Sequence, residues 1–512
     1  MELPGVPPHT PGLEPDLSEP RFNFSNTYAR LPESFYARLQ PTPTPAPHLI
    51  CLNLQLAQQL GLNPEALSSP AGVAILAGNK IAAGSEPIAL AYAGHQFGHF
   101  VPQLGDGRTN LLGEVIALNG SRFDLQLKGS GPTPFSRNGD GRAALGPVLR
   151  EYLVSEAMAT LGLPTTRALA ALSTGESVIR ETILPGGILV RVASSHLRVG
   201  SFQFFAARQD VNALRILADF AIARHYPELG NATHKYLAFL SAVIARQAEL
   251  VAQWMMLGFI HGVMNTDNMS ISGETIDYGP CAFMEAYDPA TVFSSIDHAG
   301  RYAYGNQPHA ALWNLARLAE ALLPLLAIEA ESENAAVDAA NLALSNFESQ
   351  YHKARLAGLR RKLGLFTEQP QDANLAENLL NLMQASKADF TSTFCLLCDA
   401  VDDTDGEHPL RALFTDQDSL TSWLQQWRDR LQAEAISPAQ RSESMIHANP
   451  LYIPRNHLVA EALDAATAHG DFKPFLHLLN LIYHPFIKRN GQERFATPAR
   501  PEEVVHKTFC GT

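Results

Sequence analysis

Five polar motifs follow one another along this 512-residue chain in an order that chance seldom produces. A glycine-bearing turn, Gly105-Asp106-Gly107, comes first, and Lys128 ends a strand-like run that follows it. Glu151 then falls in a helix-like run, and Asn268 and Asp277 stand on two loops much farther along. Glycines let backbone amides approach phosphate oxygens, and a lysine held by a glutamate positions those phosphates. Asn and Asp oxygens suit Mg²⁺ or Mn²⁺, so the order predicts a nucleotide and metal site.

The segments around these motifs change from strand-like to helical patterns along the chain. The runs LLGEVIAL and RFDLQLKG are separated by Asn119-Gly120, the pair that type I′ hairpin turns favour. Residues 145–162 place apolar side chains at helical spacing, and residues 176–195 return to strand-like runs. Helical patterns cover about 209–262 and dominate from about 309 onward. The pattern and the motif order together predict an α+β, protein-kinase-like two-lobed fold with a β-rich N-lobe, a helical C-lobe and additional helical extensions.

Four divisions of the chain follow from this pattern. We expect a disordered N-terminal tail over 1–20, because this stretch is rich in proline and acidic residues. Residues 21–205 form an N-terminal region and the N-lobe, in which 21–80 are mixed helix and loop. Residues 206–330 form the C-lobe with its catalytic and metal-binding loops, and 331–512 form a helical part that ends in a Cys-containing tail.

The proton acceptor of the kinase pattern is missing from its usual place. Kinases take the hydroxyl proton with the Asp of an H-R-D-x-x-x-x-N motif. With Asn268 aligned to the final Asn, that position holds Val263, which cannot accept a proton. Asp267 is the candidate replacement. If Asp267 is instead only a loop carboxylate, the protein binds a metal ion but does not catalyse a reaction.

Other charged residues near these motifs leave two questions open. Glu156 is a rival of Glu151 as the partner of Lys128, although Glu151 lies closer to the start of its helix. Arg191, Arg198 and the Asp140-Gly141-Arg142 turn exceed what a kinase needs near its phosphates. Arginine forks suit bidentate phosphate contacts and could hold a leaving polyphosphate, but each is equally explained by a surface salt bridge.

Bulk composition narrows the class of protein. The formal net charge of −13 argues against broad binding to nucleic acid or anionic membranes. Residues 121–200 nevertheless carry nine basic and six acidic side chains, which fits a local site for a small anion. Five cysteines in this length are no disulfide framework, and the N-terminal stretch lacks a signal-peptide pattern. We expect a cytoplasmic protein with no nucleic-acid or membrane partner.

The chain resembles the selenoprotein O family over most of its length after residue 20. The resemblance lies in long stretches, namely YAGHQFGHFVPQLGDGRTNLLGE, DLQLKGSGPTPFSRNGDGRAALGPVLREYLVSEAM, LVRVASSHLRVGSFQFFA, FIHGVMNTDNMSISGETIDYGPCAFM and NPLYIPRNHLVAEAL. It implies a pseudokinase-like protein that binds ATP in a flipped orientation and transfers AMP to Ser, Thr or Tyr hydroxyls of proteins. Some members are similarly described as transferring UMP from UTP with manganese.

The resemblance also implies roles for particular residues. Asp267 becomes the catalytic proton acceptor, Asn268 and Asp277 bind Mg²⁺ or Mn²⁺, and Glu151 pairs with Lys128. The implied nucleotide contacts are Gly105, Gly107, Arg108, Lys128, Asp140, Gly141, Arg191, Arg198 and Asp277. Because some members carry selenocysteine near the C-terminal end, Cys510 becomes a redox candidate that could pair with Cys281; a stray thiol explains it nearly as well.

Two rival functions remain at this stage. An ordinary protein kinase would transfer the γ-phosphate of ATP instead of AMP. A catalytically inactive nucleotide-binding scaffold, suggested by Val263, would be indifferent to the loss of Asp267. A metal-binding protein without nucleotide is less favoured, because the glycines and arginines would then lack a purpose.

Overall fold

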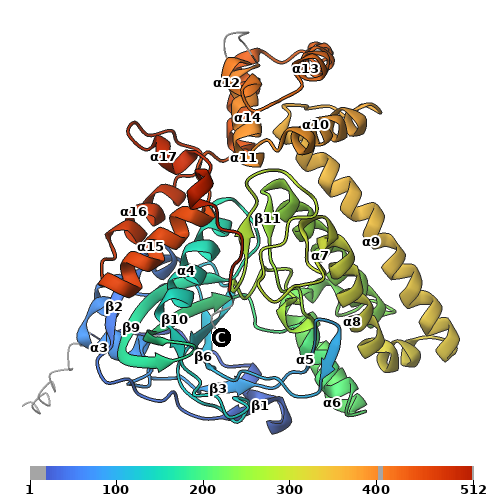
Figure 1. The fold of residues 1–512 in the computed structure, drawn as a ribbon. Coiled ribbons are helices and arrows are strands. Elements are labelled where there is room, and N and C mark those ends of the chain that lie inside the picture. The colour runs from blue at the N-terminus through green and yellow to red at the C-terminus, as the bar shows by residue number, and fades with distance from the viewer. Residues whose placement is uncertain (1–18, 402–406, 510–512) are drawn as a thin grey trace, which may run out of the picture.

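A twisted antiparallel sheet forms the centre of the N-terminal half (Figure 1). The computed structural model describes residues 19–401 and 407–509. The sheet has eight strands in the order β1-β3-β6-β7-β10-β9-β2, and β8 pairs with β10 beside this path. Their bounds are β1 (Tyr36–Arg38), β2 (His48–Leu52), β3 (Ile88–Leu90), β6 (Thr109–Ile116), β7 (Arg122–Lys128), β8 (Ala143–Ala144), β9 (Arg167–Ile179) and β10 (Ile183–Ala193). The predicted α+β class is confirmed.

The hairpin predicted at Asn119-Gly120 is present, but its turn differs from the expected type. Ala117 and Ser121 close a three-residue loop, in which Gly120 N donates to Ala117 O at 2.9 Å. Of the central residues only Gly120 has a positive φ, of 81°. The prediction of a type I′ turn, which needs positive φ at both Asn119 and Gly120, is therefore wrong. A three-residue loop with glycine in the left-handed position joins β6 to β7 instead.

Helices cover both faces of this sheet. On one face lie α1 (Leu54–Gln59), α2 (Pro64–Ser68) and α3 (Pro70–Leu76), whose leucines pack against β6, β7, β9 and β10. On the other face lies α4 (Leu145–Thr160), as predicted for 145–162. α4 is buried on nearly all sides, because α15 (Asn456–His469) and α16 (Lys473–Ile482) pack on its outer surface.

The segment 21–80 contains more strand than expected. Besides its short helices it supplies β1 and β2, which are the two edges of the sheet. These strands have three and five residues, too few to show a period-two pattern against the flanking prolines.

The following half of the chain is helical, as predicted. It contains α5 (Val199–Ala206), α6 (Val211–His225), α7 (Lys235–Met256), α8 (Gln307–Glu329) and α9 (Glu333–Lys362). The expected helical span 209–262 is interrupted after His225, where Pro227 begins a 3-10 turn. The loops that carry Asp267 and Asp277 lie between α7 and α8, together with the short pair β11 (Phe259–Ile260) and β12 (Ala282–Phe283).

Helix α8 is long and apolar. Among the described residues, one helical segment, Tyr304–Glu329, has the length and composition of a membrane span. Half of the most apolar 18-residue stretch within this segment is buried inside the protein. It packs against α5, α7 and α9. One face of the helix is therefore buried among neighbouring helices, as in the core of a helical layer, whereas apolar residues such as Ile328 remain exposed.

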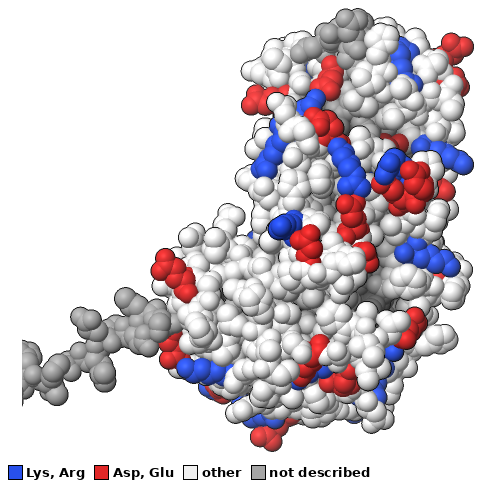
Figure 2. Space-filling view, turned by 60° about the vertical axis from the view of Figure 1, so that its left-hand side comes forward, with Lys and Arg blue, Asp and Glu red and all other residues white. Residues whose placement is uncertain are grey.

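The C-terminal part adds further helices around this centre. They are α10 (Asp372–Ser386), α11 (Phe390–Asp399), α12 (Glu407–Arg411), α13 (Gln417–Gln432), α14 (Pro438–Ala448) and α17 (Glu493–Ala496). Helices α10 to α14 project away from the sheet beyond the end of α9 (Figure 1). On the face shown in Figure 2, acidic and basic side chains are interspersed rather than gathered by sign.

Candidate active site

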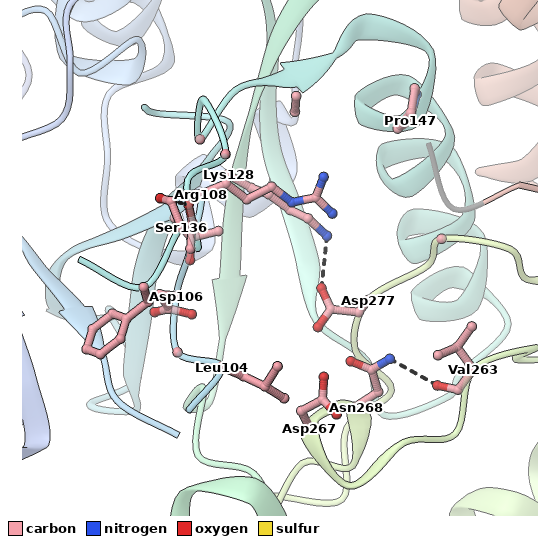
Figure 3. Close-up of a pocket in the computed structure, with 18 of the residues that line it drawn as sticks. Leu104, Asp106, Arg108, Lys128, Ser136, Pro147, Val263, Asp267, Asn268 and Asp277 are labelled. Carbon is pink, nitrogen blue, oxygen red and sulfur yellow. Dashed lines mark hydrogen bonds and ion pairs between the residues drawn. The ribbon is translucent and has the colours of Figure 1, made fainter. Parts of the chain in front are cut away.

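A cavity of about 880 Å³ lies between the sheet and the loops that join α7 to α8 (Figure 3). This volume is within the range of small-molecule and cofactor sites. Every site residue predicted from the sequence lines it: Gly105, Gly107, Arg108, Lys128, Asp140, Gly141, Glu151, Arg191, Arg198, Asp267, Asn268 and Asp277. The fold therefore brings together residues from both halves of the chain.

Lys128, the last residue of β7, makes the ion pair predicted for it. Its Nζ lies 2.5 Å from Glu151 Oε2 and 2.8 Å from Asp277 Oδ1. The rival carboxylate Glu156 is fully occupied elsewhere, because it accepts two hydrogen bonds from Arg167 and one from Asn53. The choice of Glu151 over Glu156 is confirmed.

Asp277 is the point on which the cations of the pocket converge. Its Oδ1 accepts from Lys128 at 2.8 Å and from Arg191 at 2.7 Å, and its Oδ2 accepts from Arg198 at 3.0 Å. Burial alone would raise the pKa of Asp277, but these three charges hold it well below its usual range. Its backbone φ is 64°, an uncommon conformation for a residue other than glycine. The carboxylate is thus ionised and fixed in direction.

Asp267 has a different environment from Asp277. The residue is 8% exposed, its Oδ2 accepts from Gln96 Nε2 at 3.3 Å, and its buried Oδ1 has no hydrogen-bond partner among the described residues. Burial raises the pKa of Asp267 to about 6, against the opposing charge of Arg198. A carboxylate that is ionised at neutral pH, yet more basic than usual, has the properties of a general base.

Asn268 and Asp277 offer oxygen atoms on the same side of the cavity. Asn268 Nδ2 donates to the carbonyl of Val263 at 3.0 Å, which turns its side-chain oxygen toward Asp277 (Figure 3). The described residues contain no cluster of three or more His, Cys, Asp or Glu that could hold a metal ion. Two oxygen ligands fit a cation such as Mg²⁺, which takes its remaining ligands from substrate phosphates and water.

The glycine turn is shaped by packing as well as by any ligand. Gly105 has a φ of 67°, and a Cβ there would lie 2.3 Å from the ring of Phe135. A Cβ on Gly107 would lie 2.9 Å from the Phe135 carbonyl. Contact with the 133–136 loop is therefore sufficient reason for both glycines, whether or not phosphate binds beside them.

The Asp140-Gly141-Arg142 turn also lines the cavity, and both of its charged side chains form ion pairs with residues other than Asp277. Asp140 accepts from Arg180 at 2.8 and 3.0 Å, and the Arg142 guanidinium bonds Glu176. Arg191 and Arg198, by contrast, are buried and directed at Asp277. Of the surplus arginines, these two are the ones that reach the centre of the site.

Comparison with known proteins identifies the family. The family described as protein adenylyltransferase SelO matches residues 20–483 of the chain. The chain belongs to the SelO family. The resemblance noted in the sequence is thereby confirmed, and it extends through the sheet, the cavity and the helical part.

Close relatives of this SelO family member are named protein nucleotidyltransferase YdiU. The relative from Rhodopseudomonas palustris strain BisB5 is 59% identical over 491 residues, which cover 96% of this chain and 99% of the relative. The relatives from Bradyrhizobium sp. strain BTAi1 and Methylorubrum extorquens strain PA1 are 58% and 59% identical, with the same two coverages.

Several residues of this SelO site had no role assigned from the sequence. Tyr92 stacks under Arg198, with the guanidinium 4.6 Å from the ring centroid. Gln126 Oε1 accepts from Arg191 at 2.6 Å, and Gln96 reaches Asp267. Tyr92 and Gln96 belong to the run YAGHQFGHF, which contributed only to the family resemblance. Neutral side chains carry no charge pattern that would have marked them as site residues.

Of the two cysteines that the family resemblance suggests as a redox pair, Cys281 and Cys510, the structure describes only Cys281. Cys281 is buried with a free thiol, and burial raises its pKa to about 11. Cys510 lies outside the described residues. The described segment before it passes close to Cys281, because Thr508 Oγ1 donates to Pro280 O at 2.5 Å.

Proposed function

We propose that this chain transfers AMP from ATP to Ser, Thr or Tyr hydroxyls of other proteins. The observation that carries the proposal is the pair of carboxylates in one cavity. Asp277 is ionised and held by three cations, whereas Asp267 is buried, more basic than usual and has one oxygen that meets no hydrogen-bond partner within 19–401 and 407–509. Family membership supports the same chemistry.

The proposed reaction is an in-line displacement at the α-phosphorus. The acceptor hydroxyl gives its proton to Asp267 while its oxygen forms a bond to the α-phosphorus. The bond from the α-phosphorus to the bridging oxygen breaks, and pyrophosphate leaves with the electron pair. Lys128, Arg191 and Arg198 hold the phosphates and offset the charge that develops on the leaving group.

Asn268 and Asp277 are the residues proposed to hold Mg²⁺ or Mn²⁺. A divalent cation bound there would neutralise phosphate charge and help to orient the leaving group. The chain's own contribution is the positioning of those two ligands by Val263 O and by the three cations around Asp277.

The arrangement of the chain is proposed to be that of a protein kinase with two lobes. The N-lobe would correspond to 21–205 and the C-lobe to 206–330, with 331–512 as a helical addition. The order of elements supports this, because Lys128 on β7, Glu151 on α4 and Asp277 on a later loop meet as in kinases. ATP, with UTP as a second donor, and protein acceptors are its proposed partners, and the cytoplasm is its proposed location.

Position-specific labels test this function against an ordinary kinase and an inactive scaffold. The protein is incubated with an acceptor protein extract and ATP labelled at the α- or the γ-phosphate. We expect protein-bound label from the α position only, and none from Asp267→Ala or Asp277→Ala. Label from the γ position would instead establish a kinase. Equal output from Asp267→Ala and the parent protein would establish a role without Asp267 chemistry.

A further inference from the structure

A small hairpin far away in the sequence makes contact with the loop that carries Asp267. The hairpin consists of β4 (Gly94–Gln96) and β5 (His99–Val101). Its residues hydrogen-bond to three successive loop residues: His95 N to Thr266 Oγ1 at 2.6 Å, Gln96 Nε2 to Asp267 Oδ2 at 3.3 Å, and Phe97 N to Asn265 Oδ1 at 3.0 Å. No regular sheet joins the two segments, so these contacts depend on specific side chains.

Further contacts make this junction rigid. Gln203 accepts from Thr266 Oγ1 at 2.6 Å and bonds the His95 ring at 2.8 Å. At the tip of the hairpin Phe97 has a φ of 50°, a conformation that costs free energy for an aromatic residue. Its ring packs 5.2 Å from that of Tyr302, so the tip is held against the helical half of the protein. A strained tip that is held in place keeps the Gln96 side chain in one position.

The two oxygens of Asp267 have different surroundings as a result. Oδ2 is held by the Gln96 amide, whereas Oδ1 is buried and has no partner among the residues that the structure describes. We propose that Gln96 is a positioning residue that holds Asp267 through Oδ2 and so fixes the orientation in which this carboxylate meets the acceptor hydroxyl. This inference rests on the proposed function, in which Asp267 accepts the proton.

A neutral amide is suited to this role. It donates a hydrogen bond and fixes the plane of the carboxylate, but it carries no charge that would cancel the negative charge of Asp267. Three cations of the pocket, Lys128, Arg191 and Arg198, form their ion pairs with the other carboxylate, Asp277. Arg198 reaches Asp267 only through a hydrogen bond to its backbone carbonyl, at 2.8 Å. Gln96 thus orients the base while leaving its charge available for the acceptor proton.

Two variants remove the amide donor in different ways. Gln96→Leu keeps similar bulk without polarity, and Gln96→Glu keeps the shape but replaces the donor with an acceptor. His99→Ala is the matched control, because His99 stands opposite Gln96 in the same hairpin and is exposed. Each protein is assayed for transfer from α- and γ-labelled ATP to an acceptor protein extract, and the parent and Gln96→Leu are also crystallised.

We expect turnover at saturating ATP to fall about tenfold or more in both Gln96 variants, as for loss of a hydrogen bond to a charged group. The KM for ATP should stay within about twofold, because no phosphate contact is removed. His99→Ala should match the parent. In crystals of Gln96→Leu, the Asp267 carboxylate should rotate while the Lys128–Glu151 pair remains.

The inference is overturned if either folded Gln96 variant keeps the turnover of the parent, or if the loss lies in KM alone. Its failure is distinct from failure of the proposed function. If the parent transfers label only from the γ position, the proposed function fails, and Gln96 is still judged on the label that is transferred. If the parent transfers neither label, the crystals decide, and an unchanged Asp267 orientation in Gln96→Leu rejects the inference.

Discussion

Replacing Gly94 with alanine should displace the carboxylate of Asp267, the proposed base, while leaving the side chain of Asp267 itself unchanged. Gly94 begins β4 and is buried against the Asp267 loop. A Cβ built at this position lies 2.7 Å from Asp267 Oδ1, 3.0 Å from Leu104 Cδ1 and 3.1 Å from Asp267 Cβ. Gly94 is not among the residues with positive φ, so alanine suits its backbone and the perturbation is steric alone.

The size of the effect follows from these distances. Non-bonded heavy atoms reach their van der Waals minimum at about 3.5 Å. To relieve the contact between the added Cβ and Asp267 Oδ1, the carboxylate or the hairpin must move by roughly half an ångström or more. A misplacement of about 1 Å costs on the order of 100-fold in rate, and a smaller shift costs less. We therefore expect Gly94→Ala to lower turnover about 10- to 100-fold with little change in nucleotide affinity.

The assay combines transfer kinetics from α-labelled ATP, nucleotide binding by calorimetry and thermal unfolding. Gly230→Ala is the control, because its added Cβ would meet only the Pro227 carbonyl, at 3.4 Å. Full turnover by a folded Gly94→Ala protein would refute the reasoning. A parallel loss of turnover and nucleotide binding would refute it too, because the perturbation would then have reached the phosphate contacts.

Three further predictions concern stability, the ion pair and the metal. Burial lowers the pKa of Lys362 from 10.5 to about 8, so the folded chain binds fewer protons than the unfolded chain between those values and its stability rises with pH across that window. Lys362→Met removes this buried amine and should raise the free energy of unfolding by up to about 3 kcal/mol at neutral pH. The gain should be much smaller near pH 11, where the amine of the parent protein is uncharged. An equal gain at both pH values in urea titrations would contradict this. Glu151→Gln should abolish transfer in a folded protein, because it removes the carboxylate on α4 that holds both Lys128 and Arg191. Glu156→Gln, which leaves Arg167 without its buried partner, should instead cost about 3 kcal/mol of stability but spare turnover once folded. The reverse pattern in paired activity and urea measurements would count against the assignment. Removal of divalent cations with a chelator should stop transfer, and Mg²⁺ or Mn²⁺ should restore it; unchanged labelling in excess chelator would exclude a metal role.

The predictable parts of the fold and site are those that carry a local or charged signal. The hairpin around Gly120 and the helix 145–162 follow from turn chemistry and from apolar periodicity. The Lys128–Glu151 pair follows from the order of charged motifs. The predicted turn type was wrong because the pairing of the first strand ends at Ala117 rather than at Leu118, which makes the loop three residues long, and loop length decides the turn type.

Other features depend on contacts that no local pattern reveals. Strands β1 and β2 exist because the sheet offers them edges, not because their few residues alternate. The convergence of Arg191 and Arg198 on Asp277 joins positions that are 86 and 79 residues apart. The contact from Gln96 to Asp267 spans 171 residues and uses a neutral side chain, so neither charge nor periodicity points to it.

The same long span has a consequence for how activity is acquired during folding. Contacts between residues so distant in the chain require loop closure that costs entropy before any contact is gained. A molecule in which only the sheet or only the helical half has formed would lack the contacts between the 94–101 hairpin and the 265–267 loop. The side chain of Asp267 would then have no fixed orientation. Recovery of transfer after dilution from denaturant should therefore lag behind recovery of helical circular dichroism, and catalysis would report completion of the native topology.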